Sequence, residues 1–501
     1  MAEPAHLRMA RTGGAQGLGF DFGEMPEPPP PAAQPRLVPG VSAAEAVAPQ
    51  PQKEVWIDQD DVKYETVKDD SKDQPGVIRA ATLERLVERL THEKISDPKF
   101  RKAFLLTYRS FTTPLQLIES LLFRFEPYSM TTTDDLKSKR ARVIGVVKAW
   151  MEEHFYDFGE PEVQDALINF FKEVVLTMSS AGALHKKFEK KIQETEKQKA
   201  VQQVLYVKPS LEHSYFKTLG EKGWHGIDVK VFAEQMTLLE SKIYCAILPK
   251  ECMSWNKKDK ETLAPNISAM IKQFNLFSNW VSCALVTQAT LEGRVSTLKK
   301  FIDLMEALQA LNNFNGMMEV LSGVNSSSVR RMKKTFSSLD AEYTKKFDKI
   351  EFLLSHKLSY KEYRHHLHNI NPPCVPYMGV YLTDLTFLMD GNPDNVDGGL
   401  INFKKRRLIA EVIEEIHQYQ VGYLKNESVA CIQTWMAQLP NMDDDSMYRW
   451  SKRVEPKDNE VVIEELIKSE KALNSEIEEY EKKVKEMEEL VKAEREKRGA
   501  K

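Results

Sequence analysis

The chain has no apolar run of the length that a membrane-spanning helix needs. Its 501 residues are 42% hydrophobic and 29% charged, and no stretch reaches the roughly 18 consecutive apolar residues typical of such a helix. The first residues also lack a basic segment followed by an apolar one, so we expect no secretory leader. These absences predict a cytoplasmic protein without an integral membrane segment, and they leave peripheral recruitment to a membrane open.

Cysteine is scarce and widely spaced. The five residues are Cys245, Cys252, Cys283, Cys374 and Cys431. An odd number without a CxxC pair indicates neither a disulfide framework nor a zinc site, so we interpret them as free thiols. The tightest histidine group, His365-His366-Leu367-His368, does not converge on one ion when it is placed on a helix. We therefore expect no metal and no cofactor.

Motifs of covalent and nucleotide chemistry are missing as well. The sequence has no GxxxxGK[ST], GxGxxG, GxSxG or HExxH string. Its 70 Lys+Arg against 74 Asp+Glu give a formal net charge of −4, which disfavours nucleic acid as the main partner. The basic run Lys404-Lys405-Arg406-Arg407 resembles a nuclear or acid-binding signal, but its apolar helical context favours a solvated face. Composition and periodicity therefore favour a binding or scaffold role over covalent catalysis.

What the chain has in quantity is helical periodicity. Apolar residues recur at helical spacing in stripes at Leu83–Leu90, Phe104–Phe111, Leu115–Phe125, Val143–Trp150, Val163–Phe171 and Val295–Leu311. Thr113-Pro114 predicts a helix N-cap followed by proline at the first helical position. Because no stretch alternates with period two between turn signals, we predict an all-α fold.

Changes in composition divide the chain into five segments. Ten of the 24 prolines lie in residues 1–52, so residues 1–75 are predicted to be a disordered Pro/Gly-rich tail. Its run Pro26–Pro31 suits either an SH3 or WW domain, or no specific ligand. The other predicted segments are a helical bundle at 76–200, a charged linker at 201–226, a larger helical domain at 227–457 and a coiled coil at 459–497.

The coiled-coil prediction rests on a heptad repeat. The a positions are Ile463, Glu470, Ile477, Val484 and Val491, and the d positions are Leu466, Leu473, Tyr480 and Met487. Four heptads with β-branched residues at a favour a parallel dimer, so we expect self-association through 463–491. The alternative is one long amphipathic helix that folds back on the body.

Eight strings carry more information than periodicity does. They are Gln235–Glu240 (QMTLLE), Leu311–Gly316 (LNNFNG), Asn325–Ser328 (NSSS), Asn371–Pro376 (NPPCVP), Tyr381–Asp384 (YLTD), Gly391–Pro393 (GNP), Leu400–Phe403 (LINF) and Gln418–Gln420 (QYQ). In this order and spacing they resemble the catalytic domain of Ras-family guanine nucleotide exchange factors of the Son of sevenless type, over about residues 225–455. Lys102–Pro114 (KAFLLTYRSFTTP) resembles the N-terminal Ras exchanger motif, which spans about residues 75–200.

The resemblance implies two all-α domains, an exchanger-motif bundle and a larger catalytic domain with a protruding helical hairpin at about residues 379–419. It implies a guanine nucleotide exchange factor that promotes GDP release and GTP loading on a Ras/Rap-type small GTPase. Such a protein makes and breaks no covalent bond. It binds the nucleotide-free GTPase more tightly than the loaded one, with the hairpin inserted beside switch I and braced by the motif domain.

The resemblance also assigns site residues. Asp390 and Thr386 match the hairpin positions that reach the Mg²⁺ and α-phosphate region, and Asn312 matches an interface asparagine. Asp390 is one methylene shorter than the glutamate of Son of sevenless, and Thr386 replaces a leucine. Asp390 could instead cap a turn, and Asn312 could satisfy a core partner. The remaining predicted GTPase-binding hairpin residues are Tyr381, Leu382, Thr383, Asp384, Phe387, Asn392, Arg406 and Arg407, of which the two arginines would mainly hold the hairpin against the body.

A second hypothesis is an exchange-inactive helical scaffold that binds a small GTPase and other partners. The departure at Thr386 keeps this alternative open. The strings are shared by exchangers for Ras, Rap and Ral, and Tyr381–Phe387 favours a Ras or Rap target over Ral.

Overall fold

The computed structural model describes residues 58–65, 76–126, 133–176, 178–201, 223–423, 427–456 and 473–487. They fall into two compact units. The first is drawn from Met1–Glu212, Leu238–Lys272 and Asn371–Asn426, and the second from His213–Thr237, Gln273–Ile370 and Glu427–Lys501. Helices α9 Val229–Cys245 and α12 Pro265–Val286 contribute residues to both. These units group residues by packing, so the predicted domain boundaries stay predictions.

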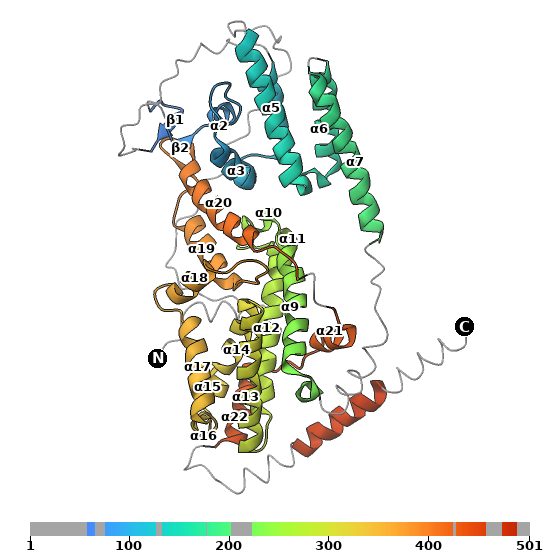
Figure 1. Cartoon of the computed structure of the whole chain (residues 1–501), viewed down its shortest axis with the longest axis vertical. Coiled ribbons are helices and arrows are strands. Elements are labelled where there is room, and N and C mark those ends of the chain that lie inside the picture. The colour runs from blue at the N-terminus through green and yellow to red at the C-terminus, as the bar shows by residue number, and fades with distance from the viewer. Residues whose placement is uncertain are drawn as a thin grey trace, which may run out of the picture. The chain divides into compact units, whose positions relative to one another are not determined.

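The first unit contains the helices expected from the N-terminal apolar stripes. They are α2 Leu83–Leu90, α3 Pro98–Thr107, α4 Pro114–Phe125, α5 Thr133–Glu153, α6 Pro161–Val175 and α7 Ser179–Val201, with short 3-10 turns at Tyr108–Ser110 and Phe155–Gly159 (Figure 1). The unit also contains α10 Pro249–Cys252, α11 Lys260–Leu263, α19 Met378–Asp390 and α20 Phe403–Gln418. Residues from distant parts of the sequence therefore share one core.

Local capping explains where several of these helices begin. The Thr113 hydroxyl accepts a hydrogen bond from the Gln116 amide, and the Gln116 side-chain oxygen accepts one from the Thr113 amide. This is a capping box with Pro114 at the first helical position. The Asp97 side chain caps α3 by accepting a hydrogen bond from the Phe100 amide. The predicted N-cap at Thr113-Pro114 is confirmed.

A buried carboxylate organises the N-terminal helices. Asp157, 1% exposed, accepts hydrogen bonds from the Tyr108 hydroxyl at 2.7 Å, Trp150 Nε1 at 2.8 Å and Arg109 Nε at 2.6 Å. Burial, helped by the Asp157 charge, raises the pKa of the Tyr108 hydroxyl. Because a buried charge is tolerated only when it is paired and hydrogen-bonded, these three donors fix the ends of α3 and α5 together.

A small antiparallel sheet accompanies the helices of the first unit. Its strands are β1 Val62–Tyr64, β2 Ile78–Ala81, β3 Asn395–Val396 and β4 Leu400–Asn402, in the order β1-β2-β4-β3. Val62 pairs with Ala81, and Ala80 pairs with Asn402. Strands of two to four residues are too short to produce a readable alternation, so the sequence did not indicate them.

All the regular secondary structure in the described part of the second unit is helical. Its elements are η3 Gly223–Gly226, α13 Leu291–Ala310, α14 Phe314–Val324, α15 Ser327–Arg330, α16 Lys333–Ser337, α17 Ala341–Leu353, α18 Lys361–Leu367, α21 Ala430–Met436 and α22 Asp444–Val454. A further helix occupies 473–487. Trp280 is the centre of an aromatic cluster, with ring centroids 5.6 Å from Phe232, 5.4 Å from Phe301 and 5.9 Å from Trp435.

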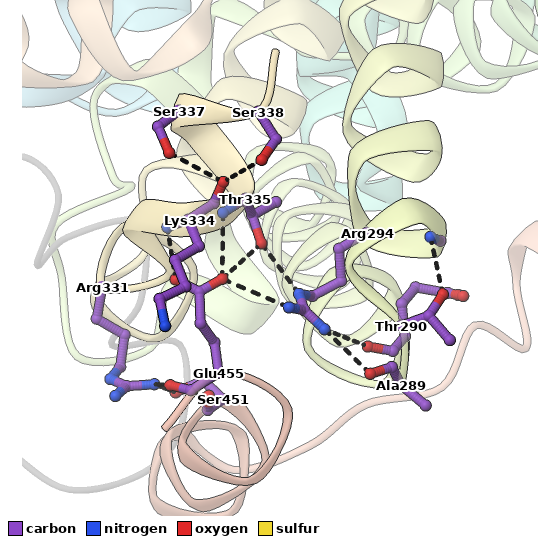
Figure 2. Close-up of polar contacts among 12 residues, drawn as sticks. Ala289, Thr290, Arg294, Arg331, Lys334, Thr335, Ser337, Ser338, Ser451 and Glu455 are labelled. Carbon is purple, nitrogen blue, oxygen red and sulfur yellow. Dashed lines mark hydrogen bonds and ion pairs between the residues drawn. The ribbon is translucent and has the colours of Figure 1, made fainter. Parts of the chain in front are cut away.

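A polar network fastens α22 within the second unit (Figure 2). The Glu455 carboxylate accepts hydrogen bonds from the Lys334 amide at 2.7 Å and the Thr335 hydroxyl at 2.8 Å, and it lies 3.5 Å from Arg294 Nη2. Arg331 Nη1 donates to the Ser451 carbonyl at 2.6 Å. Since both Glu455 and Arg294 are almost fully buried, the network is protected from solvent and fixes the end of α22 on α15 and α16.

The all-α prediction is confirmed, with the small sheet as an addition. Residues 58–65 fall within the stretch predicted to be a disordered tail, and this part of that prediction is wrong: β1 lies there because Val62, 3% exposed, is buried against β2. The proline-rich run, residues 202–222 of the predicted linker 201–226 and the ends of the heptad segment lie outside the described residues. Among the described residues, no helix is long and apolar enough to cross a membrane.

Two histidines of the first unit, the buried His154 and the half-buried His417, have buried ring nitrogens. His154 is 3% exposed, its Nδ1 lies 3.0 Å from the Tyr156 hydroxyl, and Nε2 of both His154 and His417 is buried without a hydrogen-bond partner. Burial lowers the pKa of His154 to about 4, with His417 acting in the same direction and Asp157 opposing. Burial also lowers the pKa of His417. Both rings are therefore neutral at pH 7.

We expect acid to destabilise the fold through these two histidines. The pKa of His154 in the folded chain lies below the ordinary value of 6.5, so protonation favours the unfolded chain. The free energy of unfolding is therefore highest above pH 6.5 and falls as the pH drops from 6.5 towards 4. For His154 alone the loss by pH 5 is about 2 kcal/mol. Chemical denaturation between pH 8 and pH 5 should show a weaker pH dependence for His154→Asn than for the wild type. His368→Asn, at an exposed position, is the control, and an unchanged slope for His154→Asn would contradict the assignment.

Candidate functional site

The candidate site is a helical hairpin formed by α19 and α20. Helix α19 ends at Asp390, and the chain returns through β3 and β4 to Asn402, which caps α20 by accepting from the Lys405 amide at 3.1 Å. The Asn402 amide group also donates to the Pro393 carbonyl at 3.0 Å. The turn is thus held by side chains at fixed positions, and the hairpin predicted at about 379–419 has its two helices where the sequence indicated.

Two buried cations fix the turn of the hairpin. Lys405 Nζ donates to the carbonyl groups of Met389 and Asn392, both at 2.6 Å. The Met389 carbonyl belongs to the last turn of α19, where backbone carbonyls lack helical partners. Lys405, with a side chain 5% exposed, therefore caps the end of α19 from the beginning of α20.

Arg406 performs the corresponding role one residue later. Its guanidinium donates to the Asp394 carbonyl at 2.7 Å, to Asp394 Oδ1 at 2.9 Å and to the Ser110 hydroxyl at 3.2 Å. Burial lowers its pKa, and the Asp394 charge opposes this shift. The run 404–407 is therefore not the solvated face expected from its composition, because its two central side chains are needed to satisfy the carbonyl groups of a tight turn.

The hairpin packs against the N-terminal helices of the same unit. The rings of Phe100 and Phe403 lie 4.6 Å apart between centroids, and Lys102 forms an ion pair with Glu414 at 2.9 Å. Phe403 is fully buried, so its contact with α3 is a hydrophobic anchor at the beginning of α20. Figure 1 shows α3 beside the upper end of α20.

Residues 58–81 add a second attachment to the hairpin. Strand β2 pairs with β4 through Ala80–Asn402 and Ala81–Ile401. Arg79 forms an ion pair with Asp397 in the hairpin turn at 2.6 Å, and Glu65 forms one with Arg407. Backbone pairing and two ion pairs therefore connect the strands before α2 to the turn of the hairpin.

The predicted hairpin residues differ in accessibility. Phe387 is 72% exposed, Asp390 is exposed, and Thr386, Thr383, Asp384 and Asn392 are half-buried. The hydroxyl group of Thr386 donates back to the Leu382 carbonyl at 2.8 Å. Tyr381, Leu382 and Arg406 are buried, which gives them an internal role in this structure. One end of α19 thus presents Thr386, Phe387 and Asp390 together.

A cavity of about 660 Å³ opens beside Asp390 within the first unit. Met389, Asp394, Lys405 and Arg406 line it from the hairpin, Arg109 and Ser110 from the N-terminal helices, and Lys250 and Lys257 from the segment around α10. Among the charged groups that line it, Arg109 pairs with Asp157, and Lys405 and Arg406 both pair with Asp394. The turn of the hairpin therefore borders this cavity on one side.

Asn312 belongs to the second unit, between α13 and α14. Its φ of 55° places it in the left-handed region, where asparagine is tolerated far better than most residues. The neighbouring Asn313 caps α14 through the Gly316 amide at 2.9 Å and donates to the Thr237 hydroxyl at 3.0 Å. Backbone geometry alone therefore gives a reason for asparagine at 312, while its predicted interface role stays a prediction.

Sequence reasoning missed several residues that build this site. Asp157, Asp394 and Glu65 carry no motif, and Lys405 was hidden in a run of four basic residues. A signal for Lys405 exists in its place three residues after the Asn402 cap, because a cation at the start of one hairpin helix can reach the carbonyl groups that end the other.

Two family models match the chain. The RasGEF domain matches residues 231–407, and the RasGEF N-terminal motif matches residues 77–174. The hairpin turn with Asp390, Lys405 and Arg406 lies inside the first match. Strand β1 and the segment 58–65 precede both matches.

Curated relatives agree with these matches. Ras guanine nucleotide exchange factor A of Dictyostelium discoideum is 33% identical over 411 residues, which cover 78% of this chain and 67% of that protein. Exchange factor Y of the same organism and the son of sevenless protein of Drosophila melanogaster are each 32% identical, over 76% and 77% of this chain. The chain spans only 29% and 27% of the length of these two relatives. On these grounds the chain belongs to the family of Ras guanine nucleotide exchange factors that carry an N-terminal exchanger motif.

Proposed function

We propose that this chain promotes GDP release and GTP loading on a Ras/Rap-type small GTPase, by inserting the α19–α20 hairpin beside switch I. The observation that carries the proposal is the hairpin itself: its turn is held by Lys405 and Arg406, and it presents Thr386, Phe387 and Asp390 at one end of α19. Family membership supports the reaction type. The chain would act as a catalyst of exchange without covalent chemistry.

Each of the three residues has a stated role in the proposal. The Asp390 carboxylate would repel the nucleotide phosphates and compete for their protein ligands. Thr386 would lie towards the Mg²⁺ site, and Phe387 would give an apolar contact to the GTPase. Asn312 would add a polar contact from the second unit. The string Tyr381–Phe387 supports a Ras or Rap target, and a panel of Ras, Rap and Ral proteins in one exchange assay would identify it.

The alternative is an exchange-inactive scaffold that binds a small GTPase. Thr386 supports it, because the side chain is half-buried and its hydroxyl is bonded to its own helix, so it offers less apolar bulk than leucine. Tight GTPase binding without nucleotide release would favour this alternative over exchange.

The heptad segment supports a proposal of self-association as well. Within the described helix 473–487, Leu473 at d is half-buried, and the other a and d residues, Ile477, Tyr480, Val484 and Met487, are 45%, 68%, 48% and 61% exposed. Apolar side chains at heptad spacing stabilise a helix mainly when a partner helix covers them. We therefore expect a parallel two-stranded coil with a second copy of the chain.

Substitution of Asp390 tests the exchange proposal. The full chain should accelerate the release of fluorescent GDP from a Ras or Rap protein, and Asp390→Ala and Asn312→Ala should each reduce the rate roughly tenfold or more, since each loses an interaction worth at least 1.4 kcal/mol in the transition state. Glu411→Ala on the exposed face of α20 is the control. If both variants exchange normally at unchanged Tm, the site assignment is wrong; no acceleration of any Ras, Rap or Ral protein would exclude exchange.

Lys405 and Lys404 form a matched pair for the hairpin. Lys405→Met removes the donor to two carbonyl groups and should cost about 1–3 kcal/mol in the free energy of unfolding, with a lower maximal exchange rate. Lys404→Met removes the same charge from a side chain that is 56% exposed and should leave both quantities nearly unchanged. Equal effects of the two substitutions on unfolding and exchange would show that the buried contacts do not position the hairpin.

Self-association is tested by placing a glutamate either on the a/d face of the helix or on its opposite face. Ile477→Glu should convert a dimer to a monomer in size-exclusion chromatography with light scattering, because it puts a carboxylate at a buried a position. Ser475→Glu adds the same charge at an outward f position and should leave the dimer intact. A monomeric wild type at tens of micromolar, roughly the range of a weak specific dimer, would exclude the proposal.

A further inference from the structure

Helix α22 carries cations and aromatic rings on its exposed side. Tyr448, Arg449, Lys452 and Arg453 are exposed, and Trp450 is half-buried. Residues at i, i+1, i+4 and i+5 lie on one face of a helix, which groups the first four. Lys452 Nζ lies 5.0 Å from the Tyr448 ring centroid, and Arg453 Cζ lies 5.3 Å from that of Trp450.

A neighbouring segment adds charge of the same sign. Arg331 Nη1 donates to the carbonyl groups of Ser451 and Glu455, and its guanidinium lies 5.7 Å from the Tyr448 ring. The Glu455 carboxylate accepts from the Lys334 amide (Figure 2), which brings the exposed Lys333 next to the end of α22. Lys333, Tyr448, Arg449, Trp450, Lys452 and Arg453 are called the α22 cationic surface below.

The cations of this surface are not committed to carboxylates. Within the described part of the chain, Lys333, Arg449, Lys452 and Arg453 form no ion pair within 4.0 Å. The acidic residues of α22, Asp443–Asp445, lie in its cap and first turn, where they complement the helix dipole. Asp443 interacts electrostatically with Arg449, whereas Lys452 and Arg453 lie in the last turn of α22.

Other basic segments of the chain differ in this respect. In the lysine-rich helix α7, Lys187 pairs with Glu152 at 2.6 Å and Lys190 with Glu194 at 3.6 Å. In the run 404–407, Lys405 and Arg406 are buried, and Lys404 and Arg407 both pair with Glu65. The α22 cationic surface therefore combines exposure, unpaired cations and aromatic rings, which neither of these segments does.

We infer that the α22 cationic surface binds anionic lipid headgroups at a membrane surface. Each lysine or arginine near an anionic leaflet raises the partition coefficient for the membrane roughly fivefold. Tyrosine and tryptophan favour the headgroup level, because the ring is apolar while the hydroxyl or indole N–H is polar. An acidic protein segment would match the cations but would not require the two aromatic rings beside them.

Binding to vesicles tests the inference without any GTPase, so its outcome is independent of the proposed exchange activity. The full chain should co-sediment with vesicles of about 30 mol% phosphatidylserine in phosphatidylcholine, and not with phosphatidylcholine alone. Raising the salt from about 0.1 M to about 1 M, which shortens the screening length from ~10 Å to ~3 Å, should abolish the binding. No binding to anionic vesicles, or equal binding to neutral ones, would overturn the inference.

Charge reversal locates the surface. Lys452→Glu/Arg453→Glu should reduce the partition coefficient about tenfold or more, whereas Lys452→Arg/Arg453→Lys should retain it. Lys186→Glu/Lys190→Glu on α7 makes the same change in net charge and should bind within about twofold of the wild type. Loss of binding in the α7 variant but not in the α22 variant would overturn the assignment, as would binding to soluble polyglutamate without binding to vesicles. Unchanged Tm in both variants shows that the fold is intact.

Discussion

The hairpin depends on the burial of two neighbouring cations. A turn of twelve residues between α19 and α20 leaves several carbonyl groups without helical partners, and Lys405 and Arg406 supply the donors that satisfy them. Burial of a charge is costly unless it is paired and hydrogen-bonded, and here each cation has at least three acceptors. The position of Asp390, one residue after Met389, follows from this arrangement because the Met389 carbonyl is one of those acceptors.

The same arrangement couples the hairpin to the rest of its unit. Arg406 also contacts Ser110 in the 3-10 turn that follows α3, and the Phe403 ring packs against Phe100 of α3. The end of α3 is fixed in turn by the buried Asp157, through Tyr108 and Arg109. A chain of contacts therefore runs from one buried carboxylate to the turn of the hairpin, which gives the N-terminal helices a physical means of bracing the hairpin.

Helices were predictable from sequence where periodicity and capping agree. Thr113-Pro114 and the stripe that follows it predicted the beginning and the buried face of α4, whereas the hairpin helices were predicted through the family resemblance. The four strands could not be predicted, because two to four residues carry no usable alternation and the pairing of β2 with β4 joins residues more than 300 apart. Similarly, a run of four basic residues does not reveal which of them point inward, so the burial of Lys405 and Arg406 required the structure.

The candidate site was predictable only through family resemblance. Asp390 and Asn312 have no local pattern that distinguishes a functional residue from a structural one: a carboxylate before glycine suits a turn, and an asparagine with φ of 55° suits a left-handed bend. The structure does give the exposure of the hairpin side chains: Asp390 and Phe387 are exposed, whereas Tyr381 and Leu382 are buried. Physical reasoning thus separates residues able to meet a partner from those that build the helix that carries them.

Strand β1 has a consequence for how the chain can be divided. It precedes the match to the N-terminal motif, which begins at residue 77, yet it covers one side of β2 through the pairs Val62–Ala81 and Lys63–Ala80. A fragment that begins at Val77 would leave β2 as an open edge with unsatisfied backbone groups beside the apolar residues Ala80 and Ala81. Open edges of this kind pair with other chains and promote aggregation, so a few residues outside the family boundary protect the domain from its own copies.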